Sequence, residues 1–271
     1  MSSTFTRRSL KIALSAAMLV AALVAATAPA ALAATCGNDG AGFSAWKAAT
    51  AAEAKAKGIG AKGIAALAGT SYATATINAD RNMKSFKLSL SAFMQKRGAS
   101  AIVSQGRGLK AANAGLFASI QKQYGVPAGP LIAIWGMESG FGSSSGNQNV
   151  LSATATLAYD CRRSAFFTDQ LYAELKLIDR GVLSASSRGA MQGEIGQTQF
   201  LPKTVLQYGV GDLNSKAGAL MSTANYLRAH GWAAGAGYQP GEANFGAIQA
   251  WNDASVYQQA IAIMGAQIDG K

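Results

Sequence analysis

The sequence predicts a mainly α-helical globule, and three observations support this prediction. Apolar residues recur with the 3.6-residue period of a helix along much of the chain, whereas the strict alternation of a half-buried strand is scarce. Several periodic segments end at a glycine, the residue that most readily adopts the left-handed stop of a helix. No internal repeat and no linker rich in proline or serine divides the 271 residues. We therefore expect one domain, or two small ones closely joined.

Five amphipathic segments are predicted helices. In chain order they cover residues 43–58 (FSAWKAATAAEAKAKG), 115–125 (GLFASIQKQYG), 163–181 (RSAFFTDQLYAELKLIDRG), 214–232 (NSKAGALMSTANYLRAHGW) and 245–265. In the third, one face carries Phe167, Leu171, Leu175 and Ile178. Ser215 suits the N-cap of the fourth and Gly231 its stop. Glu53 and Glu174 are expected on the solvated faces of their helices.

A sixth helix, residues 130–139, differs because it is apolar on nearly every side. Pro130 suits its first position and Gly140 a left-handed stop. Such a helix should be buried, which places Glu138 in the last turn of a buried helix. Apolar neighbours and the negative end of the helix dipole both disfavour the charged carboxylate, so we expect a raised pKa for Glu138. A carboxyl that stays protonated near neutral pH can act as a general acid. A helix-end residue turned to solvent is the alternative.

The first 33 residues have the pattern of an export signal. Arg7, Arg8 and Lys11 precede an apolar stretch from Ile12 that ends in the ALA of residues 31–33. The paired arginines fit either the general or the twin-arginine export route. The apolar run is too short and too rich in alanine for a membrane span. We expect cleavage near Ala33 and a monomer in the periplasm with no stable membrane insertion.

The two cysteines and the charge fit an exported protein. Cys36 and Cys161 are expected to form a disulfide, which in the chain-entropy model contributes on the order of 4 kcal/mol to stability. Removal of the signal lowers the formal net charge from +11 to about +8, which favours anionic partners. A bacterial cell wall and nucleic acid both meet that description, and basicity alone does not choose between them.

The residue types exclude several catalytic classes. His230 is the single histidine, so a Ser-His-Asp triad, an H-E-x-x-H zinc site and a His/Cys metal cluster each lack ligands. His230 lies at a predicted helix end, where a capping or packing role is expected. We expect no metal and no cofactor. Carboxylate chemistry remains, and among five glutamates only Glu138 and Glu194 lie in unusual surroundings.

Six stretches together resemble a known family. YGVPAGPLIAIWGMESGFG, CRRSAFF, GEIGQTQFLPKTVLQYGV, STANYLRAHGW and WNDASVYQQAI follow in this order, and NADRNMKSF near Asp80 is similar to an upstream family element. The chain resembles the lytic murein transglycosylases of the lytic transglycosylase B type. The resemblance implies a lysozyme-like, mainly α-helical transglycosylase fold over residues 34–271, with a helical N-terminal part (34–125) packed on a catalytic core (126–271).

The resemblance also implies an activity. Family members cleave the MurNAc–GlcNAc bond of peptidoglycan without water and leave 1,6-anhydro-MurNAc ends. Glu138 matches the acid that protonates the glycosidic oxygen and then acts as a base while the sugar's own C6 hydroxyl closes on C1. The implied partners are glycan strands with their stem peptides, and not nucleic acid.

Seven further positions match substrate-binding residues of the family. Asn252 matches an asparagine that supports the reacting sugar, Trp251 stands where an aromatic stacks on a sugar, and Tyr257 matches a tyrosine near the acid. Gln199 and Phe200 match residues that line the sugar cleft. The pair Arg162 and Arg163 is suited to the carboxylates of the stem peptide. Without the motifs, Trp251 and Phe200 would be assigned to packing, the arginines to a solvated pair, and Trp135 to the core.

Three positions depart from the family pattern. Ala190 replaces a serine that often hydrogen-bonds the acid, and Glu194 stands where alanine is frequent. A calcium-binding loop known in some relatives would fall near GVGDLNSK, which retains only Asp212, so no bound calcium is expected. Two alternatives therefore remain: a lysozyme-like hydrolase that uses Glu194 as a second carboxylate, and a wall-binding protein that has lost turnover.

Overall fold

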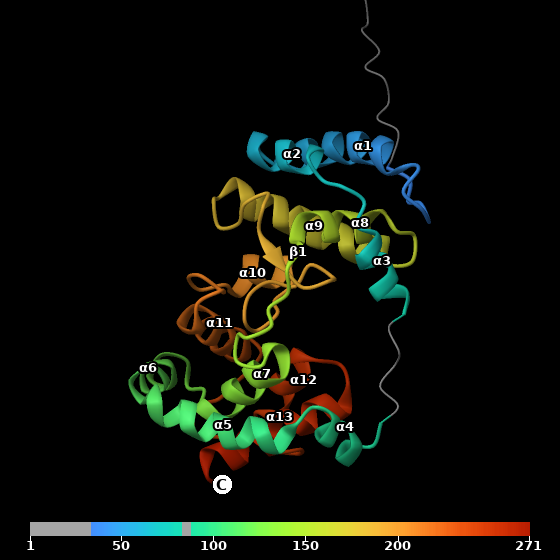
Figure 1. Cartoon of the computed structure of the whole chain (residues 1–271). Helices are drawn as coiled ribbons and strands as arrows, with labels where there is room; N and C mark the ends of the chain where they lie inside the picture. The colour runs from blue at the N-terminus through green and yellow to red at the C-terminus, as the bar shows by residue number, and fades with distance from the viewer. Residues whose placement is uncertain (1–33, 83–87) are drawn as a thin grey trace, which may run out of the picture. The chain divides into compact units, whose positions relative to one another are not determined.

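The structure, a computed structural model, describes residues 34–82 and 88–271. Within these residues the chain forms thirteen α-helices and one antiparallel two-stranded sheet, shown in Figure 1. The helices are α1 (Phe43–Ala56), α2 (Ala61–Ala68), α3 (Thr74–Arg81), α4 (Leu90–Lys96), α5 (Ala99–Ala112), α6 (Ala114–Tyr124), α7 (Ala128–Ser139), α8 (Val150–Tyr159), α9 (Ser164–Asp179), α10 (Pro202–Tyr208), α11 (Lys216–Ala229), α12 (Phe245–Trp251) and α13 (Ser255–Asp269). The strands are β1 (Gln148–Asn149) and β2 (Arg188–Gly189), with Gln148 opposite Gly189. The predicted fold class, mainly α, is confirmed.

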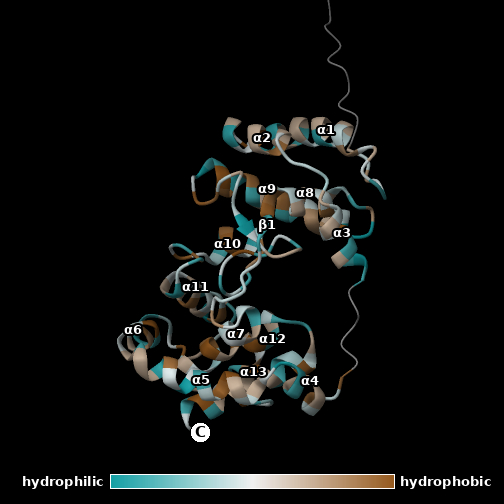
Figure 2. Ribbon diagram, viewed as in Figure 1, coloured by the Kyte–Doolittle hydropathy of each residue, from teal (hydrophilic) through white to brown (hydrophobic). Residues whose placement is uncertain are grey.

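Two large hydrophobic clusters hold the helices together. One joins α4–α7 with α11–α13, and the other joins α1–α3 with α8 and α9. In Figure 1, α1 and α2 lie beside α8 and α9, and Figure 2 shows the hydrophobic residues of α9 and α13. A third, smaller cluster is formed mainly by the segment that connects β2 with α11, including Ile195, Phe200 and Leu213. Val150 of α8 and Leu177 of α9 complete it. Each large cluster takes helices from both sides of residue 125, and the division into parts 34–125 and 126–271 stays a prediction.

Four of the predicted helices are confirmed with small changes at their ends: α1, α6, α9 and α11. Gly125 ends α6 in the left-handed conformation with φ 75°. Ser215 caps α11, since its hydroxyl accepts a hydrogen bond of 3.0 Å from the N–H of Gly218. Gly231 follows α11 with φ 94°.

The predicted buried helix is α7, which starts two residues earlier than expected. Pro130 is its third residue. The N–H of Gly129, in the first turn, donates a hydrogen bond of 2.9 Å to the carboxylate of Asp269, which is distant in the sequence. Every residue of α7 except Glu138 is buried, and Gly140 ends it with φ 55°. Both the burial and the stop are therefore confirmed.

The single helix predicted over residues 245–265 is wrong. The structure has α12 and α13 with a break at Asn252, whose backbone is extended with φ −153°. The Asn252 side-chain oxygen accepts a hydrogen bond of 2.9 Å from the N–H of Ala254. An asparagine that bonds its own backbone two residues ahead competes with the helix, and here the local turn prevails.

The prediction for Glu174 is also wrong. Its side chain is 0% exposed, because α9 is covered at this position by its packing on α8, α2 and α10. Burial raises the pKa of Glu174 to about 8, with Thr154 of α8 acting in the opposite direction. Glu53 is partly exposed and accepts hydrogen bonds from the Ala34 N–H (3.0 Å) and the Tyr172 hydroxyl (3.2 Å).

The predicted disulfide is confirmed. Cys36 and Cys161 are bonded, with their Cα atoms 5.0 Å apart and 125 positions apart in sequence. The export signal and its cleavage after Ala33 lie outside the described residues. Within the described ranges, none of the helices has the length and apolar character that crossing a membrane requires.

Candidate active site

Glu138 is held in place at the end of α7 by donors from two other helices. The Tyr257 hydroxyl of α13 donates to Glu138 Oε1 at 2.6 Å, and the Trp251 indole Nε1 at the end of α12 donates to the same oxygen at 3.2 Å. Burial is the largest influence on this carboxyl and raises its pKa. The two hydrogen bonds and the Arg97 guanidinium oppose that rise, and the negative charge of Glu194 adds to it. The predicted raised pKa agrees with this arrangement.

An open cavity of about 290 Å³ lies in front of Glu138. It brings together five of the eight residues predicted for catalysis or substrate binding, and its lining is Glu138, Glu194, Gln199, Phe200, Leu201, Thr204, Tyr226, Trp251 and Asn252. Tyr257 lies just behind, 3% exposed, and reaches the cavity through its contact with Glu138. Two carboxyls, those of Glu138 and Glu194, and several aromatic rings therefore meet in one cavity.

Three rings form one wall of this cavity. The Phe200 and Trp251 rings are 5.3 Å apart between centroids, and Trp251 meets Tyr226 edge-on at 5.2 Å. Phe200 is only 2% exposed, so its role is to support Trp251, which is itself partly exposed. His230 stacks on Tyr226 at 3.9 Å and bonds the Tyr226 carbonyl, which confirms the packing role expected for the histidine. Partly exposed aromatic surface of this kind suits packing against a sugar ring.

Two amide side chains reach the cavity from tight turns. Gln199 has a positive φ of 55°, an uncommon conformation for a residue other than glycine, and such residues cluster at functional sites. Its Nε2 donates to the carbonyls of Gly196 (2.8 Å) and Ser145 (3.3 Å), and these two bonds fix the side chain. Asn252 sits in the break between α12 and α13 with its Oδ1 engaged by the Ala254 N–H.

Arg162 and Arg163 do not line the cavity. Asp80 of α3, 2% exposed, bonds both guanidinium groups, and Arg162 Nε donates to Asp80 Oδ2 at 2.8 Å. The arginine side chains remain 43% and 32% exposed. The same carboxylate accepts a 3.2 Å hydrogen bond from Gln192 Nε2, which connects the pair to the loop that carries Glu194. The expected contact of these arginines with stem peptides stays a prediction.

Glu194 is the second carboxyl of the cavity. Burial raises its pKa, while its own N–H, the Gln192 N–H (3.0 Å to Oε2) and the charge of Arg163 act in the opposite direction. Ala190 has no hydroxyl with which to bond Glu138. Among the described residues, the side chains that donate to Glu138 are those of Tyr257 and Trp251.

Several residues of the site were not singled out from the sequence. Tyr226 and Thr204 line the cavity, and Asp80 organises the arginine pair. Gln197 connects α7 with the loop before α11. Its Oε1 accepts a hydrogen bond from Trp135 Nε1 at 2.9 Å, and its Nε2 donates to the Asn214 carbonyl at 2.5 Å. Trp135 is 3% exposed, as its assignment to the core requires. Tyr226 and Gln197 both lie inside the quoted motifs, which is the signal that could have identified them.

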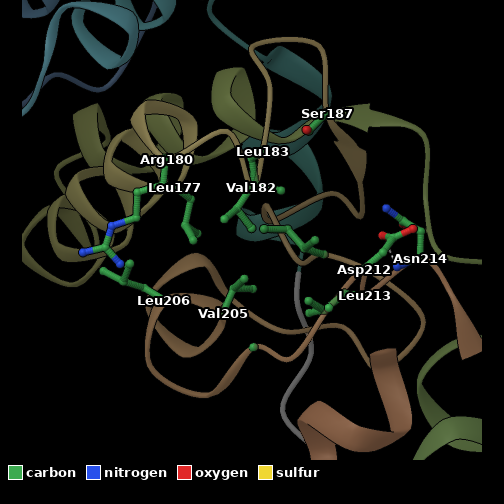
Figure 3. A pocket seen from close by; sticks show the side chains of 13 residues that line it. Leu177, Arg180, Val182, Leu183, Ser187, Val205, Leu206, Asp212, Leu213 and Asn214 are labelled. Carbon is green, nitrogen blue, oxygen red and sulfur yellow. Dashed lines mark hydrogen bonds between the residues drawn. The ribbon is translucent and has the colours of Figure 1, made fainter. Parts of the chain in front are cut away.

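A larger cavity of about 520 Å³, shown in Figure 3, is lined in part by Ile195, the residue that follows Glu194. Its lining is mostly aliphatic, with Leu177 and Val205 facing each other across it and Arg180 and Asp212 at its borders. Among the described residues that line this cavity, Asp212 is the only acid, so they offer no pair of carboxyls for acid–base chemistry. The smaller cavity at Glu138 is therefore the candidate active site.

Comparison with known proteins gives a family. The transglycosylase SLT domain matches residues 42–241. A curated relative, the membrane-bound lytic murein transglycosylase B of Escherichia coli, is 34% identical over 121 residues. That match covers 41% of this chain and 34% of the relative, so the chain matches about a third of the relative's length.

Solved structures give the same result over a greater share of the chain. SltB3 from Pseudomonas aeruginosa, in complex with NAG-NAM-pentapeptide, is 30% identical with a TM-score of 0.78 over 84% of this chain and 80% of that chain. The soluble lytic transglycosylase SltB1 from Pseudomonas aeruginosa, 21% identical with a TM-score of 0.74, covers 83% of this chain and 98% of its own, and shares the fold. The chain belongs to the transglycosylase SLT domain family.

Proposed function

We propose that this protein is a peptidoglycan lytic transglycosylase of the periplasm, and that it cleaves the MurNAc–GlcNAc bond without water. The observation that carries the proposal is the state of Glu138: a carboxyl with a raised pKa, fixed by two donors, at the wall of a cleft. Family membership supports it. SltB3 has been solved with NAG-NAM-pentapeptide and with NAG-anhNAM-pentapeptide, a substrate-like and an anhydro ligand.

In the proposed reaction Glu138 acts first as an acid. The bond between C1 of MurNAc and the bridging O4 breaks, and the Glu138 proton moves to that oxygen. The Tyr257 and Trp251 donors stabilise the carboxylate left on Glu138. Glu138 then takes the proton of the C6 hydroxyl while O6 bonds to C1. Glu138 ends protonated, and no water is consumed.

The other site residues are proposed to hold the glycan. Trp251 and Tyr226 offer aromatic surface to the sugars, and Asn252 and Gln199 supply amide groups at the cavity wall. Arg162 and Arg163 together carry one more positive charge than Asp80 neutralises, which suits the carboxylates of a stem peptide.

A lysozyme-like hydrolase is the second candidate, because Glu194 lines the same cavity as Glu138. An inverting or retaining hydrolase needs a second carboxylate to activate water or to attack the sugar. The two candidates differ in one product: the hydrolase leaves reducing MurNAc ends, and the transglycosylase leaves anhydro ends.

The test is mass spectrometry of fragments released from purified sacculi by the mature protein and by Glu138→Gln. Glu242→Gln is the control, since Glu242 is an exposed glutamate in a loop that does not line the cavity. We expect anhydro-muropeptides from the native protein and the control, and none from Glu138→Gln. Reducing ends would establish the hydrolase. Binding to sacculi with no fragments from any of the proteins would establish a wall-binding protein.

A further inference from the structure

The cavity of Glu138 contains a second carboxyl, Glu194, to which the proposed mechanism gives no task. We propose that Glu194 is a second functional carboxylate of this cleft: it accepts a hydrogen bond from a hydroxyl or acetamido N–H of the sugar next to Glu138, and its negative charge adds to the burial that keeps Glu138 protonated until the glycosidic oxygen takes the proton. This inference rests on the proposed function, because it assigns Glu194 a role toward the same glycan.

The loop around Glu194 is rigid. Ile195 and Phe200 exchange two backbone hydrogen bonds of 2.8 and 3.0 Å, which close the loop directly after Glu194. Gly193 has φ 88°, and a Cβ there would lie 2.3 Å from the Thr154 hydroxyl, so the turn before Glu194 fits only glycine. The chain thus fixes the direction in which the Glu194 side chain enters the cavity, as a substrate-positioning group requires.

Burial raises the pKa of Glu194, and the polar groups around it oppose that rise and favour its ionised form. Two backbone N–H groups, its own and that of Gln192, donate to the carboxyl, and Arg163 at the start of α9 attracts it. The Gln192 side chain and Arg163 are themselves bound to the buried Asp80. Asp80 therefore holds Arg163 and the side chain of Gln192, two of the residues that stabilise a negative Glu194.

Glu194 also has acceptor capacity left for a ligand. Each hydrogen bond to its carboxyl comes from the backbone, and among the described residues no side chain donates to it. A carboxylate has about four acceptor positions. A sugar in the cavity brings hydroxyl and acetamido N–H donors, which form charge-assisted hydrogen bonds with such an oxygen.

The charge of Glu194 acts on Glu138 in the direction that an acid needs. The groups that face Glu138 from other elements are Tyr257 of α13, Trp251 of α12, Arg97 at the end of α4, and Glu194. The first three favour the carboxylate, and Glu194 is the charged group that favours the protonated form. Two carboxyls that share one cavity resist simultaneous ionisation, so a proton placed on Glu138 is retained while Glu194 stays negative.

The experiment compares the mature native protein with Glu194→Gln and Glu194→Ala. The control is Glu242→Gln, because the Glu242 carboxylate also accepts a backbone hydrogen bond in its own loop, from the Gln239 N–H at 2.6 Å, but lies outside the cavity. Release of anhydro-muropeptides and of reducing ends is followed by liquid chromatography and mass spectrometry as a function of pH, on solubilised glycan strands. Near-ultraviolet circular dichroism verifies that each variant is folded.

We expect Glu194→Gln to move the basic limb of kcat/KM to lower pH, since the negative charge that helps Glu138 to retain its proton is gone. We expect Glu194→Ala to raise KM roughly tenfold through the lost hydrogen bond to the sugar. The control should follow the native profile in both respects.

Two results would overturn the inference. If the basic limb of Glu194→Gln superimposes on that of the active native protein, Glu194 has no electrostatic role. If KM is unchanged in Glu194→Ala, Glu194 makes no contact with the sugar. If the native protein yields reducing ends and only the Glu194 variants lose them, Glu194 is instead the base of a hydrolase. A native protein that releases no fragments at all overturns the proposed function itself, and the inference with it.

Discussion

Glu174 provides a quantitative test of the packing between α8 and α9. Its carboxyl is completely buried, and neither oxygen forms a regular hydrogen bond within the described residues. Burial raises its pKa from 4.5 to about 8. The unfolded chain loses this proton near pH 4.5 and the folded chain only near pH 8. The contribution of Glu174 to the free energy of unfolding is therefore highest below pH 4.5 and falls continuously up to pH 8.

The magnitude follows from the two pKa values. At about 1.4 kcal/mol per pH unit, the free energy of unfolding falls by about 5 kcal/mol between pH 4.5 and pH 8. About 3 kcal/mol of this decrease has already occurred at pH 7. Glu174→Gln removes the ionisation and keeps the shape. Its buried amide costs about 1 to 3 kcal/mol at every pH, so the variant is less stable in acid and more stable at alkaline pH.

The assay is urea unfolding followed by circular dichroism from about pH 4.5 to about pH 9. The measured quantity is the difference in unfolding free energy between Glu174→Gln and the native protein, because the titrations of other buried groups cancel in that difference. We expect it to move in favour of the variant by several kcal/mol as the pH rises, with Glu242→Gln parallel to the native protein. A difference that does not depend on pH would refute the burial of an ionisable Glu174.

Three further predictions concern single contacts. Reduction or serine replacement of Cys36 and Cys161 should lower the free energy of unfolding by about 4 to 5 kcal/mol, since the bond closes a loop of 125 residues; an unchanged urea midpoint would count against it. Tyr257→Phe removes the 2.6 Å donor to Glu138, so the basic limb of kcat/KM should move to higher pH and kcat/KM should fall roughly tenfold; a shift to lower pH would contradict this geometry. Asp80→Asn leaves two guanidinium groups without their carboxylate and should cost about 1 to 3 kcal/mol of stability, measured by urea unfolding, because the arginines are partly solvated; no loss would show that the ion pairs contribute nothing.

The sequence predicted the features of the site that depend on local pattern. The apolar run before Gly140 was sufficient to bury α7 and to place Glu138 at its end, because burial on every side is visible in the residues themselves. Ser215 and Gly231 likewise marked both ends of α11 through capping chemistry.

Features that depend on distant partners were not predictable in this way. Glu174 occupies a polar position of an amphipathic helix, and it is buried only because α8, α2 and α10 pack against α9. The bond between Arg162 and Asp80 joins residues 82 positions apart. The break at Asn252 depends on a side chain that prevails over the helical pattern around it, and that break places Trp251 and Asn252 in the cavity.

The central claim is that Glu138 directs cleavage by an internal hydroxyl and not by water. The most direct measurement is digestion of purified sacculi by the mature protein in water enriched in heavy oxygen, with mass spectrometry of the new chain ends. The proposed mechanism predicts anhydro-MurNAc ends without any heavy oxygen, and no release by Glu138→Gln. New reducing ends that carry heavy oxygen would contradict it, because water would then have attacked C1.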